Sequence, residues 1–152
     1  MTGKSNPAAN DDSIAYLLRD TYAAFVQAFE DDLEKAGIGL SLWFLLRALA
    51  KEDLLSQKQL MQRAGLLLQP ATSAALKRME SLGLILRHED AVDRRKVRFA
   101  LTRQGHALIR RLGPAAAAVR QDAVRDFTPE EFAQLRKFLQ RMQSNLQAGE
   151  IT

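Results

Sequence analysis

The residues with the clearest chemical meaning are the lysines and arginines in the middle of the chain. Ten of them lie between Gln57 and Arg103 beside only four acidic residues, so this stretch carries a net charge of +6. The whole chain of 152 residues carries +4, which leaves the remainder slightly acidic. A basic segment of this kind indicates a surface for a polyanion such as nucleic acid, although charge alone favours a solvated face.

The combinations of side chains that make an enzyme or a metal site are missing from the sequence. It has no cysteine, which excludes disulfides, thiolate metal sites and thiol redox switching. Its two histidines, His88 and His106, have no metal-ligand partner at the usual spacing. We find no nucleophile with a base partner, no H-E-x-x-H motif and no glycine-rich phosphate loop. We therefore expect a protein that is not an enzyme and that needs no metal or cofactor.

The apolar spacing predicts one mainly helical domain over residues 1–152. Residues 1–12 are small and polar and are expected to form a disordered tail without the apolar core of a signal peptide. A long amphipathic helix is expected over residues 13–38, because its apolar residues recur every three or four positions. No apolar run is long enough to cross a bilayer, so we expect a cytoplasmic protein.

The segment over residues 40–102 predicts three short helices followed by two strands. After a helix near residues 41–50, the capping-box pattern at Ser56 begins a second helix that ends near Gly65. A third helix opens at Gln69-Pro70 and stops at Gly83. The periodicity then changes to two in residues 84–89 and 96–101, which predicts a small β-hairpin with a basic loop between its strands.

Two further helices are expected over residues 103–147. The first is capped by Thr102 and contains Gly113-Pro114, where we expect either a kink or a break into two helices. The last begins after Thr128, and its apolar residues form a seam for packing against another helix.

The order of these elements is that of a winged helix-turn-helix, in which one short helix enters the major groove and the hairpin lies along the backbone. An arginine at the hairpin tip can also enter the minor groove. The predicted DNA contacts are residues on the exposed side of the 69–82 helix and at the hairpin tip, namely Gln69, Pro70, Ala71, Thr72, Ser73, Lys77, Arg94, Arg95 and Lys96.

The sequence also resembles the MarR family of bacterial regulators. The resemblance rests on residues 55–60, on residues 76–85, and on the wing Asp93-Arg94-Arg95 that leads through a strand to Leu101-Thr102-x-x-Gly105. It spans about residues 13–146, which is nearly the whole chain. The chain departs from many relatives at Ala74, where they carry a basic residue.

The resemblance implies a homodimer whose first and last helices interlock, which makes residues 13–38 and 103–147 dimerisation helices and residues 40–102 the DNA-binding lobe. It implies a repressor of a nearby operon at a pseudo-palindromic operator, released by a small ligand. It also implies that Asp93 orients Arg95 through an ion pair, so that Arg94 faces DNA. A ring and a carboxylate of an aromatic acid are expected to bind Tyr22, Phe25, Trp43 and Arg47.

Three other interpretations of the sequence remain. The winged fold could serve as an adaptor that binds another protein, although the arginine-tipped hairpin argues against this. The chain could bind DNA without responding to any ligand. An enzyme on a helical scaffold is the third, and no motif in the sequence supports it.

Overall fold

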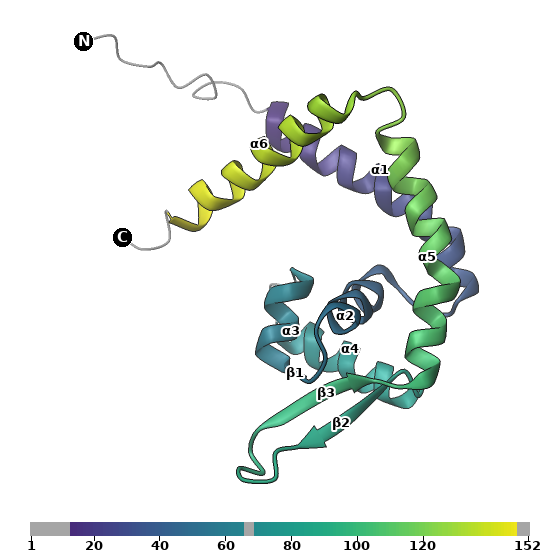
Figure 1. Cartoon of the computed structure of the whole chain (residues 1–152), viewed down its shortest axis with the longest axis vertical. Helices are drawn as coiled ribbons and strands as arrows, with labels where there is room; N and C mark the ends of the chain where they lie inside the picture. The colour runs from purple at the N-terminus through teal and green to yellow at the C-terminus, as the bar shows by residue number, and fades with distance from the viewer. Residues whose placement is uncertain (1–12, 66–68, 149–152) are drawn as a thin grey trace. The chain divides into compact units, whose positions relative to one another are not determined.

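The computed structural model describes residues 13–65 and 69–148, and it confirms a mainly helical fold with a small antiparallel sheet (Figure 1). The predicted tail, residues 1–12, lies outside the described residues. The chain divides into two compact units, one through Ala117 and one from Ala118. The elements of the first unit are α1 (Ser13–Lys35), α2 (Leu40–Lys51), β1 (Leu55–Ser56), α3 (Gln57–Ala64), α4 (Gln69–Ser81), β2 (Ile85–Glu89) and β3 (Val97–Leu101). Helix α5 (Arg103–Ala123) continues into the second unit, which also holds α6 (Pro129–Ala148).

The sheet has three strands in the order β1-β3-β2, and all neighbours are antiparallel. Phe99 of β3 faces Leu55 on one side and Arg87 on the other. The sequence predicted only the β2–β3 hairpin, since the two residues of β1 are too few to show a period of two. Strand β1 fixes the start of α3 against the sheet, which the hairpin alone would not do.

The hydrophobic core of the first unit joins the short helices to the sheet. Its fully buried side chains come from five elements, and those with almost no exposed surface include Leu45, Leu46, Leu55, Leu60, Leu76, Met79 and Ile85. Burial of such side chains stabilises each by about 1.5–3 kcal/mol relative to an exposed position. The orientations of α3, α4 and the sheet are therefore set by one shared core.

The ends of α3 confirm the predicted capping pattern. Ser56 Oγ accepts a hydrogen bond from the Gln59 backbone N–H (3.2 Å), and Gln59 Oε1 accepts one from the Ser56 N–H (2.9 Å). Gly65 closes the helix in the left-handed conformation (φ 68°), which a glycine adopts without steric cost. These local signals confine α3 to eight residues.

The Leu101-Thr102-x-x-Gly105 motif has a packing role where the sheet meets α5. Thr102 Oγ1 donates to the Gly83 carbonyl (2.6 Å) and accepts from the Gly105 N–H (3.0 Å), so one hydroxyl caps α5 and ties it to the start of β2. A β-carbon at Gly105 would collide with the Leu84 carbonyl oxygen. The motif therefore fixes the base of the wing.

Helix α5 runs from Arg103 to Ala123 with Pro114 inside it, so the break into two helices does not occur. In α6 no residue is buried, and Met142 is the most covered, at an intermediate level. Among the described residues, no helix combines the length and the apolar character that spanning a membrane requires.

Candidate nucleic-acid interface

Helix α4, the predicted reading helix, packs one face into the core and exposes the other. Pro70, Ala71 and Lys77 are exposed, as expected of residues that could contact DNA. Ser73 is half-buried, and the side chain of Gln69 is outside the described ones. Polar contacts from this helix are thus confined to a narrow exposed stripe.

Thr72 corrects the sequence prediction. We expected it on the exposed side of the helix, but its side chain has no exposed surface. Residues three or four apart share a face of a helix, so Thr72 lies on the same face as Ala75, Leu76 and Met79. The expectation was wrong because it followed the polar residue type rather than the helical phase of these apolar neighbours.

Ser73 has a structural partner on the neighbouring helix. Gln57 Nε2, in the first turn of α3, donates a 2.6 Å hydrogen bond to Ser73 Oγ. The contact ties the first turn of α3 to the second turn of α4 and adds to the core packing that orients the two helices. Ser73 can still donate its own hydroxyl proton to a ligand.

The loop at the end of the wing is organised by Asp90, which sequence reasoning did not single out. Its Oδ1 accepts from the backbone N–H groups of Val92 (2.8 Å) and Asp93 (3.2 Å). Backbone bonds between Asp90 and Lys96 and between Lys96 and Asp93, both 2.9 Å, close the loop. An aspartate at the end of a strand is a typical start of such a turn, so the signal was present in the sequence.

The same contacts change the acidity of Asp90. Hydrogen bonds from the N–H groups of Val92 and then Asp93 lower the pKa of this carboxyl, and the charges of Lys96 and Arg98 lower it further. Each favours the ionised form, which accepts the bonds that shape the loop.

Asp93 orients the wing differently from our expectation. Its Oδ1 accepts from the backbone N–H of Arg95 (3.1 Å). The expected ion pair with the Arg95 guanidinium is not found among the described residues. A carboxylate two residues upstream reaches the backbone more easily than the end of a long side chain, so Asp93 sets the course of the chain and leaves the guanidinium available.

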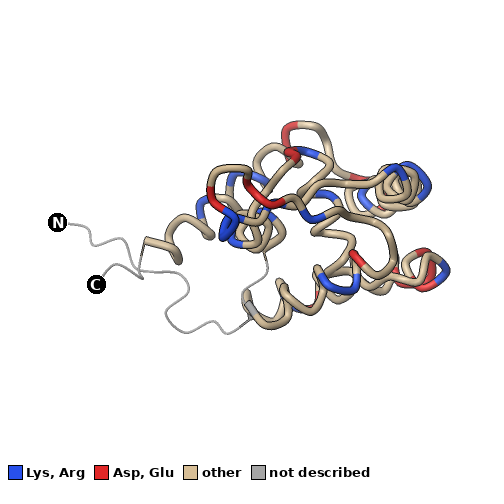
Figure 2. The backbone as a smooth tube through the Cα atoms, turned by 90° about the horizontal axis from the view of Figure 1, so that it is seen from below, with Lys and Arg blue, Asp and Glu red and all other residues tan. Residues whose placement is uncertain are grey.

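The charged residues are mixed along the chain, with acidic segments between basic ones (Figure 2). The important question is therefore which cations already have partners. Arg87 pairs with Glu80 (3.1 Å), and Arg63 pairs with Glu52 (2.6 Å).

Two more arginines are held by backbone carbonyls. Arg98 Nη1 donates to Leu54 (3.1 Å), whose backbone is left-handed (φ 57°), and Arg78 Nη2 donates to Gly37 (3.4 Å). Both guanidinium groups therefore bind backbone segments of the chain itself.

The remaining cations of α3, α4 and the wing make no ion pair or side-chain hydrogen bond within the described residues. These uncommitted cations are Lys58, Lys77, Arg94, Arg95 and Lys96. All five are exposed. Four of them are predicted DNA contacts, whereas Lys58 was counted in the basic segment but was not predicted as a contact, because only the third short helix and the hairpin tip were assigned contacts.

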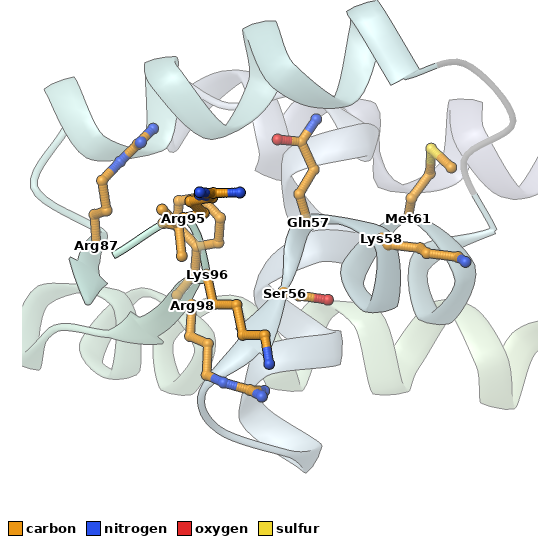
Figure 3. Close-up of a pocket in the computed structure, with 10 residues that line it drawn as sticks. Ser56, Gln57, Lys58, Met61, Arg87, Arg95, Lys96 and Arg98 are labelled. Atoms are coloured by element: carbon orange, nitrogen blue, oxygen red, sulfur yellow. The ribbon is translucent and has the colours of Figure 1, made fainter. Parts of the chain in front are cut away.

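A basic groove of about 610 Å³ lies between α3 and the sheet. Ser56, Gln57, Lys58 and Met61 line it from the α3 side, and Arg95, Lys96 and Arg98 line it from the β3 side (Figure 3). Its walls also include the Phe99 ring, over which the Arg87 guanidinium lies at 5.6 Å. Cationic side chains over an aliphatic and aromatic floor suit the sugar-phosphate backbone of a nucleic acid.

The four predicted ligand residues differ in exposure. Tyr22 and Phe25 of α1 are 56% and 39% exposed, whereas Trp43 of α2 is 5% exposed. Trp43 packs edge-on against Phe29 (5.4 Å between ring centroids), and the Arg47 guanidinium lies 5.7 Å over its ring. Trp43 therefore anchors α2 in the core, and the half-buried Arg47 is the polar group beside it.

Comparison with known proteins gives consistent results. The model of the MarR family matches residues 36–96. The homoprotocatechuate degradative operon repressor of Escherichia coli is 29% identical over 129 residues, which is 85% of this chain and 86% of the relative. The HTH-type transcriptional regulator FarR of Neisseria gonorrhoeae is 30% identical over 108 residues, 71% of this chain and 73% of the relative.

Two solved structures show the same fold. NadR in complex with 4-hydroxyphenylacetate has a TM-score of 0.76 and 25% identity, and the match covers 88% of this chain and 94% of NadR. A mutant MarR from E. coli complexed with operator DNA has a TM-score of 0.78 and 18% identity, covering 91% and 99% of the two chains.

Proposed function

The chain belongs to the MarR family of DNA-binding transcriptional regulators, and from this premise we propose that it is a cytoplasmic, homodimeric repressor of a nearby operon. In this proposal a small aromatic acid releases it from a pseudo-palindromic operator. The proposal treats residues 40–102 as the DNA-binding lobe, and residues 13–38 and 103–147 as dimerisation helices.

The observation that carries the proposal is the set of five uncommitted cations. Their neighbours Arg63, Arg78, Arg87 and Arg98 each have a carboxylate or a carbonyl partner, but these five do not have one among the described residues. Exposed charges on three neighbouring elements attract a polyanion, and each phosphate contact releases counterions. We expect Lys58, Arg95 and Lys96 to bind the phosphates, and Lys77 to lie over the major groove with Pro70, Ala71 and Ser73.

Support for a homodimer comes from apolar residues that the single chain leaves exposed. On α1 they are Ile14, Tyr16, Leu17, Leu18, Tyr22 and Phe25, and on α6 they are Phe132, Leu135, Phe138, Leu139 and Leu146. Apart from Tyr16, which lies on the other side of α1, each set recurs at helical spacing, which is typical of a face that another helix covers. A second copy of the chain is the proposed cover.

Support for an aromatic acid comes from a relative and from the residues of α1 and α2. NadR, 25% identical to this chain, was solved with 4-hydroxyphenylacetate. In this chain the exposed rings of Tyr22 and Phe25 could pack against the ring of such a ligand, and Arg47 could pair with its carboxylate. The buried Trp43 would hold the Arg47 guanidinium over its ring rather than contact the ligand.

Three measurements on the full chain test the proposal. Selection from a random-sequence DNA pool should enrich a two-fold symmetric site whose half-sites are about one helical turn, ~10 bp, or a multiple apart. Light scattering should give twice the mass of one chain, and a thermal-shift screen of aromatic acids should find one that also weakens DNA binding. A monomer at micromolar concentration, or a pool with no enriched sequence, would contradict the proposal.

The ligand residues need a matched pair of variants. Arg47→Ala should abolish the rise in melting temperature that the acid causes, while the variant still binds DNA when no acid is present. Arg19→Ala on α1 removes the same charge from an exposed residue already paired with Asp20 (2.7 Å), so it should leave the shift unchanged. If both variants respond to the acid as the unmodified chain does, the assigned ligand site is wrong.

A further inference from the structure

The apex of the wing differs chemically from its sides. Val92 is 97% exposed, and Ala91 beside it is also exposed. Three uncommitted cations, Arg94, Arg95 and Lys96, follow within four positions. The loop that holds them is the outermost part of the sheet (Figure 1). The wing therefore presents a small aliphatic apex followed directly by positive charge.

Val92 is held in place although its side chain packs against almost nothing. Its backbone N–H is fixed on Asp90 Oδ1 (2.8 Å), and the loop is closed by the bonds between Asp90 and Lys96. A β-branched side chain also has few rotamers. A valine on the apex adds nothing to the core, and because its side chain has few rotamers it loses little entropy when another molecule covers it.

An aliphatic apex followed by cations suits the minor groove of B-DNA in chemical character. That groove is about 6 Å wide, and aliphatic side chains are among those that proteins insert into it. Its walls are deoxyribose C–H groups and its edges are phosphates, so an aliphatic apex with cations behind it is complementary to both.

We propose that Val92 is a shape-reading residue that packs against the deoxyribose walls of the minor groove of the operator, while Arg94 and Arg95 bind the phosphates at its edges. This inference rests on the proposed DNA-binding function and adds a contact that carries no charge. A valine side chain makes no hydrogen bond, so it distinguishes sites by groove width rather than by base identity.

The experiment compares Val92→Ala, Val92→Thr and Arg94→Ala on a duplex selected from a random pool by the unmodified chain. Affinity is measured over a range of salt concentrations. Val92→Ala removes two methyl groups and should weaken binding about three- to tenfold, with the salt dependence unchanged. Val92→Thr keeps the shape and should lose less. Arg94→Ala should make the slope of log K against log salt shallower by about one.

Hydroxyl-radical cleavage locates the contact, because these radicals attack deoxyribose hydrogens in the minor groove. The unmodified chain should protect a short run of sugars at the edge of the site. Val92→Ala should lose that protection and keep the rest of the footprint.

The outcomes distinguish a failure of the role proposed for Val92 from a failure of the proposed DNA-binding function. If the unmodified chain binds no DNA, both fall. If it binds and Arg94→Ala behaves as expected, but Val92→Ala changes neither affinity nor the footprint, only the role of Val92 is overturned. Thermal unfolding should be the same for both valine variants, and a lower melting temperature in either would show that Val92 packs within the chain instead.

Discussion

The reading helix α4, with Lys77, and the wing loop, with Arg94, Arg95 and Lys96, carry four of the five uncommitted cations on two different kinds of support. Helix α4 is held by the core, in which Thr72, Leu76 and Met79 have almost no exposed surface. The loop between β2 and β3 has no buried residue, and its shape comes from hydrogen bonds to Asp90 and Asp93.

This difference separates two properties of the protein. A change that moves α4 must also disturb the core, so the contacts that we propose in the major groove should depend on the stability of the whole first unit. A change in the wing loop alters only local hydrogen bonds and exposed charge, so the contacts that we propose to the phosphates and the minor groove should be able to vary while the fold stays constant.

The largest effect, on the free energy of unfolding, is expected from a change to a buried residue that holds α4 in the core. Met79→Ala leaves a cavity in the core and should lower the free energy of unfolding by about 2–5 kcal/mol. Leu86→Ala is the matched control, because Leu86 in β2 is 55% exposed and should change that free energy by less than about 0.5 kcal/mol. Chemical denaturation measures both. Equal losses would mean that burial does not distinguish α4 from the wing.

The next effect comes from the charge on the wing. Arg94→Ala combined with Arg95→Ala should make the slope of log K against log salt shallower by about two, with unfolding unaffected. Arg110→Ala with Arg111→Ala removes the same charge from exposed positions of α5 and serves as the control, with light scattering used to check that it keeps the mass of the unmodified protein. If the control reduces the slope as much as the wing variant does, the wing acts through the net charge of the protein rather than through contacts of its own.

The sequence predicted the helices well because most of them had a stripe of apolar residues, a signal at one end, or both. Ser56 and Gln59 gave the start of α3, and Gly65 gave its end. Strand β1 was missed because two residues have no readable period. At Pro114 local chemistry predicted a kink or a break into two helices, and the break does not occur.

The candidate site was predicted less completely, because residue type identifies a cation but does not reveal its partner. Arg87 and Arg98 look alike in the sequence, yet one pairs with Glu80 and the other holds the carbonyl of Leu54. These partners lie 7 and 44 positions away, so only the fold brings them together. Asp90 was missed although its partners, Val92 and Asp93, are close in the sequence. The pattern that reveals it is that of a turn, and the prediction for the hairpin followed the positive charges instead.

The third effect tests whether one carboxylate organises the wing loop. Asp90→Ala removes the acceptor, so the amide protons of Val92 and Asp93 should exchange about tenfold faster. Asp90→Asn keeps an acceptor oxygen and should lie between this variant and the unmodified chain. Amides of α4 should not change in either variant. Faster exchange in α4 as well would show that the wing and the reading helix are not independent.

The smallest effect is the pH dependence of the same loop. The pKa of Asp90 is lower in the folded chain than in the unfolded one, chiefly through its hydrogen bond from Val92. Its contribution to stability is therefore complete above the unfolded pKa and is lost as the pH falls through the folded pKa. An NMR titration should give an Asp90 midpoint below that of an ordinary aspartate, with the Val92 amide signal moving at the same pH. None of the buried α4 residues among those described is a carboxylate, so the amide signals of α4 should not shift at that midpoint. A shared midpoint would mean that the wing loop and α4 are not held independently.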